Sequence, residues 1–168
     1  MNYRVRNFLI TSGWQSYSET RQEAWDRSVW MVGELCRFAE KYGVSLTMET
    51  LSRQSTTLVN TISDLKQMMK EVNSKAFTIT ADIHTIYNAK ESIQDYFDTF
   101  GKKLNHCHFM DYKNGIRSHL AWGDGEADIK EILDIFDRNR FSGHFVLDIQ
   151  IVNTFWSLLR FMRKHIIS

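Results

Sequence analysis

The sequence predicts an α/β protein built on a parallel sheet. Short apolar runs, typical of buried strands, alternate with amphipathic stretches of helical length along the whole chain, which gives five units. This alternation is typical of βαβ units, in which the strands are parallel and helices cover the sheet. No linker or low-complexity stretch separates the units. We therefore expect residues 1–168 to form one domain.

The expected strands are the apolar runs. The first, residues 7–11 (NFLIT), ends at a Ser-Gly pair that leads into a polar loop. The second, residues 44–50 (VSLTMET), follows a long helical pattern and precedes a Ser/Thr-rich loop. The same reasoning places the other three strands at residues 76–81, 104–110 and 144–149.

The expected helices are amphipathic. Across residues 21–42, apolar side chains recur at steps of four and three, and Gly43 follows where a helix C-terminus favours glycine. A second apolar pattern predicts a helix over residues 58–72, with a cap supplied by residues 55–57. Three further helices are expected at residues 89–100, 128–139 and 154–165.

Composition argues against several classes of protein. The chain is 43% hydrophobic and 24% charged with a formal net charge of +1, as in an ordinary soluble domain. Its basic residues are scattered rather than gathered in a stripe, so nucleic acid is not an expected partner. No long apolar run or leader sequence predicts a membrane segment, so we expect a cytoplasmic protein. Cys36 and Cys107 lack a CxxC spacing, which argues against a disulfide framework.

Acidic or histidine side chains end four successive strands. Glu49, Asp82, His108 and Asp148 each close an apolar run at a comparable place. In parallel α/β folds the carboxyl ends of the strands lie at one edge of the sheet and carry the chemistry. A single acid at a strand end usually caps a helix or anchors a loop, but four at equivalent positions favour a site. The set suits Mn²⁺, Mg²⁺, Co²⁺ or Zn²⁺.

The stretch from residue 102 to 125 concentrates further polar candidates. In a strand, His106 and His108 lie on the same face, because side chains alternate. His106 can be a second imidazole of the site or a satisfied core histidine, and the sequence leaves both open. The pattern Gly123-Asp-Gly125 resembles part of a phosphate loop, but a lone GxG more often forms a turn before a helix.

Five segments of the chain resemble one family. They are LCRFAEKYGVSLTMETL, TADIHTIYN, FDTFGKKLNHCHFMD, SHLAWGDGEADIKEIL and FSGHFVLDI. Their order and spacing resemble the xylose isomerase-like TIM barrels, specifically the sugar isomerases and ketose 3-epimerases, with the fructoselysine 3-epimerase branch most similar. The resemblance implies one divalent metal, usually Mn²⁺, held by Glu49, Asp82, His108 and Asp148.

The resemblance also implies an incomplete (β/α)8 barrel. Family members have eight βα units, whereas this chain resembles units four to eight. An open arc of parallel strands leaves edges exposed, so we expect a homo-oligomer that covers them. Three positions depart from the family. The last ligand is Asp148 rather than Glu; a substrate-binding His expected three residues after Asp82 is replaced by His84 at two; and Asn114 occupies the place of an Arg found in tagatose-type epimerases.

The implied reaction is C3 epimerisation of a ketose or a fructosamine-type sugar through an enediolate. Glu49 and Asp148 would be the catalytic pair, one removing a proton and the other returning it from the opposite face. Substrate contacts are expected from His84, His106, Asp111 and His119, although packing or surface exposure is the simpler interpretation of His84. Two alternatives remain: an aldose-ketose isomerase, and an inactive remnant or half-barrel binding module. An endonuclease IV-like nuclease ranks last.

Overall fold

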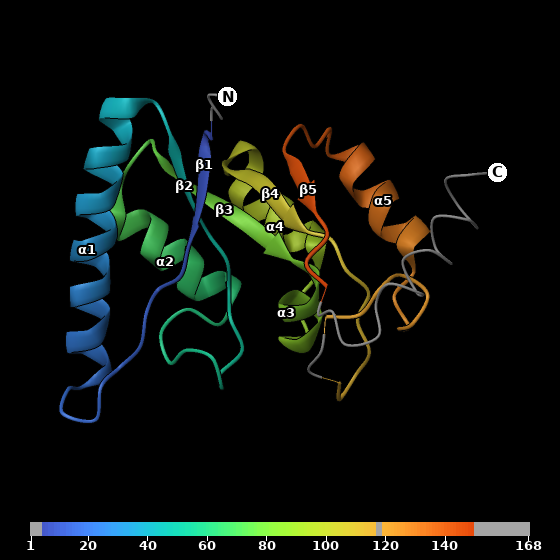
Figure 1. Cartoon of the computed structure of the whole chain (residues 1–168), viewed down its shortest axis with the longest axis horizontal. Coiled ribbons are helices and arrows are strands. Elements are labelled where there is room, and N and C mark those ends of the chain that lie inside the picture. Colours follow the sequence, from blue (N-terminus) through green and yellow to red (C-terminus); the bar gives the residue numbers. More distant parts are fainter. Residues whose placement is uncertain (1–4, 117–118, 150–168) are drawn as a thin grey trace.

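The computed structural model describes residues 5–116 and 119–149 and shows a five-stranded, entirely parallel sheet (Figure 1). The strand order follows the chain without reversal, β1-β2-β3-β4-β5, as in a barrel and unlike a doubly wound sheet. The predicted α/β class and the half-barrel are confirmed. The strands are β1 (Asn7–Ile10), β2 (Ser45–Met48), β3 (Phe77–Asp82), β4 (Leu104–His108) and β5 (His144–Val146).

The longer helices form a layer against the sheet, each packed on the next along the chain. Contacts join α1 to α2, α2 to α4, and α4 to α5 (Figure 1). The described helices are α1 (Arg21–Tyr42), α2 (Ile62–Val72), α3 (Ile83–Asn88), α4 (Ile93–Phe100) and α5 (Ile129–Arg138), with a short 3-10 turn at Gly101–Lys103. None of the helices in this part of the chain is long and apolar enough to span a membrane.

Helix α1 begins and ends as the sequence predicts. The Thr20 hydroxyl accepts a hydrogen bond from the Glu23 amide while the Glu23 carboxylate accepts from the Thr20 amide, which forms a capping box. Gly43 ends the helix with a φ of 64°, a left-handed conformation that glycine adopts without strain. Local sequence therefore determines both ends of this helix.

The start of α2 corrects a prediction. The helix begins at Ile62 rather than at residue 58, and its cap is Thr61 rather than residues 55–57. Thr61 forms a capping box with Asp64, and Leu58 is buried in the preceding loop. The apolar spacing misled the prediction because a buried loop residue and a buried helical residue look alike in sequence.

The expected helix at residues 89–100 is also wrong in its extent. The structure has two helices, α3 directly after β3 and then α4, which starts only at Ile93. Lys90 separates them with a φ of 58°, which α-helical backbone does not allow. Asp82 caps α3 and Ser92 caps α4. The helix expected at residues 154–165 lies outside the described residues.

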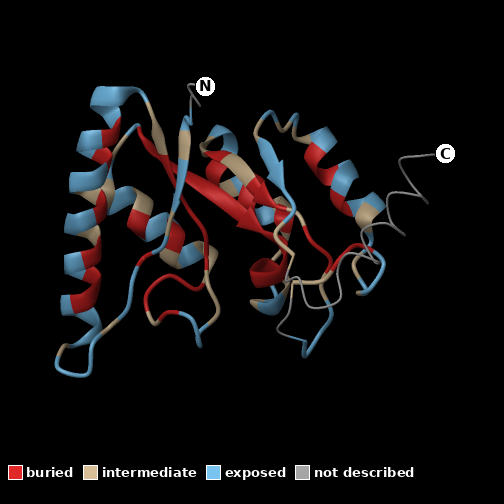
Figure 2. Cartoon of the chain, in the orientation of Figure 1, coloured by how far each residue is buried: buried red, intermediate tan, exposed pale blue. Residues whose placement is uncertain are grey.

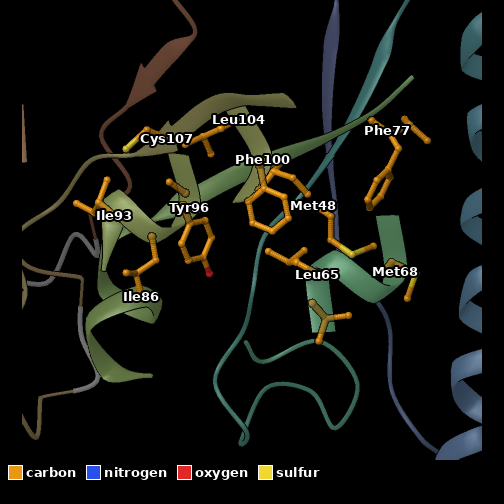
Figure 3. Close-up of a cluster of buried hydrophobic side chains, with 14 of the residues drawn as sticks. Met48, Leu65, Met68, Phe77, Ile86, Ile93, Tyr96, Phe100, Leu104 and Cys107 are labelled. Atoms are coloured by element: carbon orange, nitrogen blue, oxygen red, sulfur yellow. The ribbon is translucent and has the colours of Figure 1, made fainter. Parts of the chain in front are cut away.

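The core lies between the sheet and the helices. Every residue of β3 is buried, while β1 and β5 are largely exposed (Figure 2). Side chains from β2, β3 and α2 interdigitate at one end of the core, and those from α3, α4 and β4 at the other (Figure 3). Phe8 of β1 and Phe145 of β5 are 47% and 45% exposed. The open edges match the half-barrel, and the oligomer expected to cover them stays a prediction.

Both cysteines are buried free thiols, as the spacing predicted. Cys36 lies on α1 and Cys107 on β4. Burial raises the pKa of both thiols, which keeps them protonated at neutral pH.

Candidate functional site

Four predicted ligands converge at the carboxyl end of the sheet. Glu49 follows β2, Asp82 ends β3, His108 ends β4 and Asp148 lies two residues beyond β5. The strand register places Asp82 beside His108, and His108 beside Val146. Parallel pairing of the strands therefore brings residues that are up to 99 positions apart into one cluster.

The His108 Nδ1 atom is the centre of this cluster. It lies 2.9 Å from Glu49 Oε2, 3.2 Å from Asp82 Oδ2 and 3.8 Å from Asp148 Oδ2. Glu49, Asp82 and His108 are buried, whereas the Asp148 side chain is 46% exposed. Asp148 Oδ2 also lies 3.2 Å from His119 Nδ1, which brings His119 to the edge of the cluster.

These donor separations suit a divalent cation. Two ligand atoms that each lie about 2.1 Å from one ion at a right angle are about 3.0 Å apart. Two groups of three side chains have ligand atoms within 4.8 Å of one another: Glu49, Asp82 and His108, and also Asp82, His119 and Asp148. Asp82 belongs to both groups. One Asp82 oxygen accepts the Thr85 amide at 2.8 Å, which leaves the other facing His108. The cluster could hold one ion.

The metal-free cluster has a distinct pattern of protonation. Burial raises the pKa of Glu49. Burial acts in the same direction on Asp82, but hydrogen bonds from His108 and the Thr85 amide outweigh it and lower the pKa of that carboxyl. Burial also opposes a charged His108, yet its hydrogen bonds to Asp82 and Glu49 prevail and raise its pKa to about 10. Without metal, His108 is therefore the cation that balances these buried carboxylates.

We expect metal affinity to rise with pH as a result. The free imidazole of His108 must lose its proton to bind metal, and below a pKa of about 10 this costs one proton per ion. The Kd for Mn²⁺ should therefore fall by about tenfold per unit between pH 6.5 and 8.5. Calorimetric titration at three pH values measures this slope. A His108→Gln variant should bind weakly with a flatter slope, and a pH-independent wild-type affinity would contradict the assignment.

The raised pKa of His108 also makes the stability of the metal-free fold depend on pH. This stability falls as pH rises, whereas the metal affinity increases. The pKa of folded His108 is above its ordinary value of 6.5, so the metal-free fold binds this proton more tightly than the unfolded chain does. The resulting stabilisation is complete below pH 6.5 and is lost as pH rises towards 10. High pH thus weakens the metal-free fold while favouring the metal complex.

A cavity of about 910 Å³ opens beside the cluster. Four residues predicted for the site line it: Glu49, Asp82, His84 and His119. The loop after β2 and the α3–α4 turn supply most of the remaining wall. Sequence reasoning missed these loop residues, because Arg53, Asn60 and Lys90 belong to no motif.

His84 and His119 lie together in the cavity wall. Their ring centroids are 5.2 Å apart. The His84 Nδ1 atom is buried and has no hydrogen-bond partner among the described residues. Burial lowers the pKa of His84, so its imidazole is neutral at pH 7. Because the Nδ1 atom is buried, the surface interpretation of His84 is excluded, whereas packing in the cavity wall and contact with a substrate through the rest of the ring both stay open.

His106 lies against His108 of the candidate ligand cluster but outside the cavity wall. Its ring meets that of His108 edge to face at a centroid distance of 5.4 Å. Its Nδ1 atom is buried without a partner in the described part of the chain, and burial lowers its pKa. This position suits support of the His108 ring, and the substrate contact expected of His106 stays a prediction.

Asp111 is engaged by the loop that follows it rather than by the cavity. One carboxylate oxygen accepts hydrogen bonds from the amides of Tyr112 and Ala127, and the other accepts from Gly123 and Gly125. A Cβ at Gly125 would lie 2.3 Å from the Tyr112 carbonyl oxygen, so only glycine fits there. The Gly123-Asp-Gly125 pattern thus forms a turn before α5.

Comparison with known proteins finds one family model and several similar sequences. The model of the family described as xylose isomerase-like TIM barrel matches residues 2–165. Fructoselysine 3-epimerase from Escherichia coli O157:H7 is 28% identical over 142 residues, which cover 84% of this chain and 51% of that protein. D-psicose 3-epimerase from Ruminiclostridium cellulolyticum is 29% identical over 110 residues, or 62% of this chain and 38% of that protein. The chain spans about half the length of the fructoselysine 3-epimerase.

Solved structures share the fold. A D-tagatose 3-epimerase-like protein superposes with a TM-score of 0.77 at 21% identity, covering 94% of this chain and 61% of that one. D-psicose 3-epimerase from Clostridium cellulolyticum H10, solved with D-tagatose, gives a TM-score of 0.70 at 24% identity over 86% of this chain and 50% of that one. Both likenesses concern the half-barrel described above.

Proposed function

Because the chain belongs to the xylose isomerase-like TIM barrel family, we propose that it carries the metal centre of a sugar epimerase. The proposed reaction is C3 epimerisation of a ketose or a fructosamine-type sugar such as fructoselysine. One observation carries the proposal: Glu49, Asp82 and Asp148 converge on His108 beside a cavity of substrate size.

The proposed ligands are Glu49, Asp82, His108 and Asp148, and Mn²⁺ is the proposed ion, with Mg²⁺, Co²⁺ and Zn²⁺ as alternatives. A bound ion supplies Lewis-acid polarisation of the substrate carbonyl. Asp82 is fixed by its bond to the Thr85 amide, which holds its free oxygen in place. His84 and His119 are proposed to bind sugar hydroxyls from the cavity wall.

Glu49 and Asp148 are the proposed acid-base pair. Burial raises the pKa of Glu49, which makes this carboxylate a stronger base for removing a proton from carbon. Asp148 follows β5, the strand next to β4, and approaches His108 from that side. Its side chain is partly open to solvent. If one carboxylate removes the C3 proton and the other returns a proton to the opposite face, the carbon is inverted through an enediolate.

Two alternatives remain open. An aldose-ketose isomerase would use the same residues to move a proton between carbons 1 and 2. A metal-binding module without turnover is favoured by the 46% exposure of the Asp148 side chain. The position at which solvent hydrogen enters the sugar separates the first alternative from epimerisation, and the absence of turnover separates the second.

The deciding experiment follows fructoselysine by NMR in D2O with the Mn²⁺-loaded chain. We expect deuterium at C3 and a C3-inverted product. Glu49→Gln removes a proposed metal ligand and a proposed acid-base group together, so the rate should fall by at least about 10²–10⁴-fold. Glu34→Gln, on the exposed face of α1, is the matched control and should keep the rate.

Each outcome has a defined meaning. Deuterium at C1 or C2 with an aldose product would favour the isomerase. Metal binding with no exchange at any carbon would favour the binding module. Equal exchange by Glu49→Gln and wild type would contradict the assigned role of Glu49.

A further inference from the structure

Two cationic side chains line the same cavity as Glu49 and Asp82, two of the proposed metal ligands. Arg53 lies on the loop after β2, and Lys90 lies on the turn between α3 and α4. Both segments extend from the end of the sheet that carries Glu49 and Asp82 (Figure 1). Among the described residues that line the cavity, the acidic ones are Glu49 and Asp82. Charge is therefore divided, with acids at the strand ends and cations on the loops beyond them.

Neither cation is neutralised by a neighbouring carboxylate. Ion pairs within 4.0 Å occur elsewhere in the described chain, for example between Arg21 and Asp64 at 3.4 Å, but none includes Arg53 or Lys90. An exposed cation without a partner is common on protein surfaces. Two of them line one cavity next to the proposed sugar site, where a negatively charged substrate group would meet them.

The loop that carries Arg53 is held firmly. Thr56 is buried and its hydroxyl donates a hydrogen bond to the Gly13 carbonyl at 2.6 Å. The Asn60 amide group donates to the carbonyls of Leu51 and Thr56 at 2.7 and 3.1 Å. The loop around Arg53 is thereby closed on itself by Asn60 and tied to the loop after β1 by Thr56.

The turn that carries Lys90 is held in the same way. The Lys90 amide donates to the Tyr87 carbonyl at 3.0 Å, and the Glu91 amide donates to the Ile86 carbonyl at 3.1 Å. The Glu91 carboxylate accepts the Ile62 amide at 2.9 Å, which joins the turn to α2. Since both backbones are already ordered, binding an anion would cost only the ordering of two side chains.

We propose that Arg53 and Lys90 form an anion subsite that binds a carboxylate or phosphate group on the far end of the sugar substrate. The inference rests on the proposed function, because it deepens the choice of substrate. The cavity volume of about 910 Å³ lies at the upper end of the range of about 300–1,000 Å³ for small-molecule pockets, which suits a sugar with a side arm. The α-carboxylate of fructoselysine is one such group, and a sugar phosphate carries another.

Direct binding to the Mn²⁺-loaded full chain tests the subsite without requiring turnover. Calorimetry would compare four ligands: fructoselysine, its α-carboxamide, fructose 6-phosphate and psicose. An anion held by two cations should bind about tenfold tighter than its neutral counterpart. Because the contacts are partly exposed, added salt should weaken the binding of the charged ligands and leave the affinity of the neutral ligands unchanged.

A double variant and a matched control locate the effect. Arg53→Met with Lys90→Met should abolish the preference for the anion and leave psicose binding unchanged. Lys66→Met with Arg138→Met removes the same two charges from exposed positions on α2 and α5 and should behave as wild type. The unfolding midpoint of each variant would confirm that the fold is intact.

The possible results separate the subsite from the catalytic proposal. A preference for fructoselysine assigns a carboxylate, and a preference for fructose 6-phosphate assigns a phosphate. Equal binding of charged and neutral sugars, or failure of all four to bind, would overturn the subsite. An anion preference lost in the double variant, without any exchange at C3, would retain the subsite and refute the epimerase. C3 exchange without an anion preference would support the epimerase and refute the subsite.

Discussion

Saturating Mn²⁺ is expected to raise the unfolding midpoint of the wild-type chain. The midpoints of the Glu49→Gln and His108→Gln variants should hardly change when the ion is added. An ion that binds only the native state stabilises it by about 2.7 kcal/mol at 100 times its Kd. For a chain of this size, about 1 kcal/mol shifts the midpoint by about 2–4 °C, so the expected rise is about 5–10 °C. Thermal unfolding followed by circular dichroism, with and without the ion, measures it.

The two variants lose the effect for different reasons. Glu49→Gln replaces a buried anionic oxygen with an amide, which is a poor ligand for a hard cation. His108→Gln removes the nitrogen from which all three carboxylates lie within 4 Å. Asp98→Asn on α4 serves as a control, because Asp98 lies on an exposed helix face and contacts Gln94.

A repeat with Mg²⁺, Co²⁺ and Zn²⁺ would rank the candidate ions. Equal Mn²⁺ shifts in wild type and both variants would place the ion elsewhere on the chain. The absence of any shift in the wild type would mean that these strand ends do not hold an ion in this chain.

Asp111→Ala is expected to destabilise the fold by about 3 kcal/mol, because it removes a buried carboxylate that satisfies several backbone amides. Asp111 is only 2% exposed, and its oxygens accept from Tyr112, Gly123, Gly125 and Ala127 at 2.8 to 3.0 Å. Alanine would leave these donors without their partner in the loop that leads into α5. Urea unfolding measures the change in free energy.

Asp124→Ala is the matched control, since Asp124 is an exposed aspartate in the same loop. Its effect should stay within about 0.5 kcal/mol, as for most surface substitutions. Similar free energies for the two variants would mean that the loop does not depend on the Asp111 carboxylate.

The parallel half-barrel could be predicted from the sequence because its signals are periodic. Helix α1 is determined by residues that are close together in the chain. These are its apolar pattern and the residues at its ends, Thr20, Glu23 and Gly43. The strand-end acids could also be found, since parallel strands share one carboxyl edge and a position in the chain translates directly into a position on that edge. Glu49 and Asp82 are of this kind.

Other features depended on contacts between distant segments. The break at Lys90 and the late start of α2 at Ile62 arise where local capping and packing override a plausible apolar pattern. The four hydrogen bonds that the Asp111 carboxylate accepts from backbone amides join it to residues up to 16 positions away. A sequence pattern contains no information about which donors a folded loop will present to such a side chain.

The sequence alone therefore determined the fold class, the direction of the strands and the residues at their ends, because each of these follows from local periodicity and chain order. Only the tertiary structure decided which polar side chains share one cavity. It turned His84 towards His119, assigned Asp111 to a loop, and placed Arg53 and Lys90 in one wall. The reason is physical: side-chain environment depends on where loops pack, and loop packing is set by long-range contacts that no local spacing records.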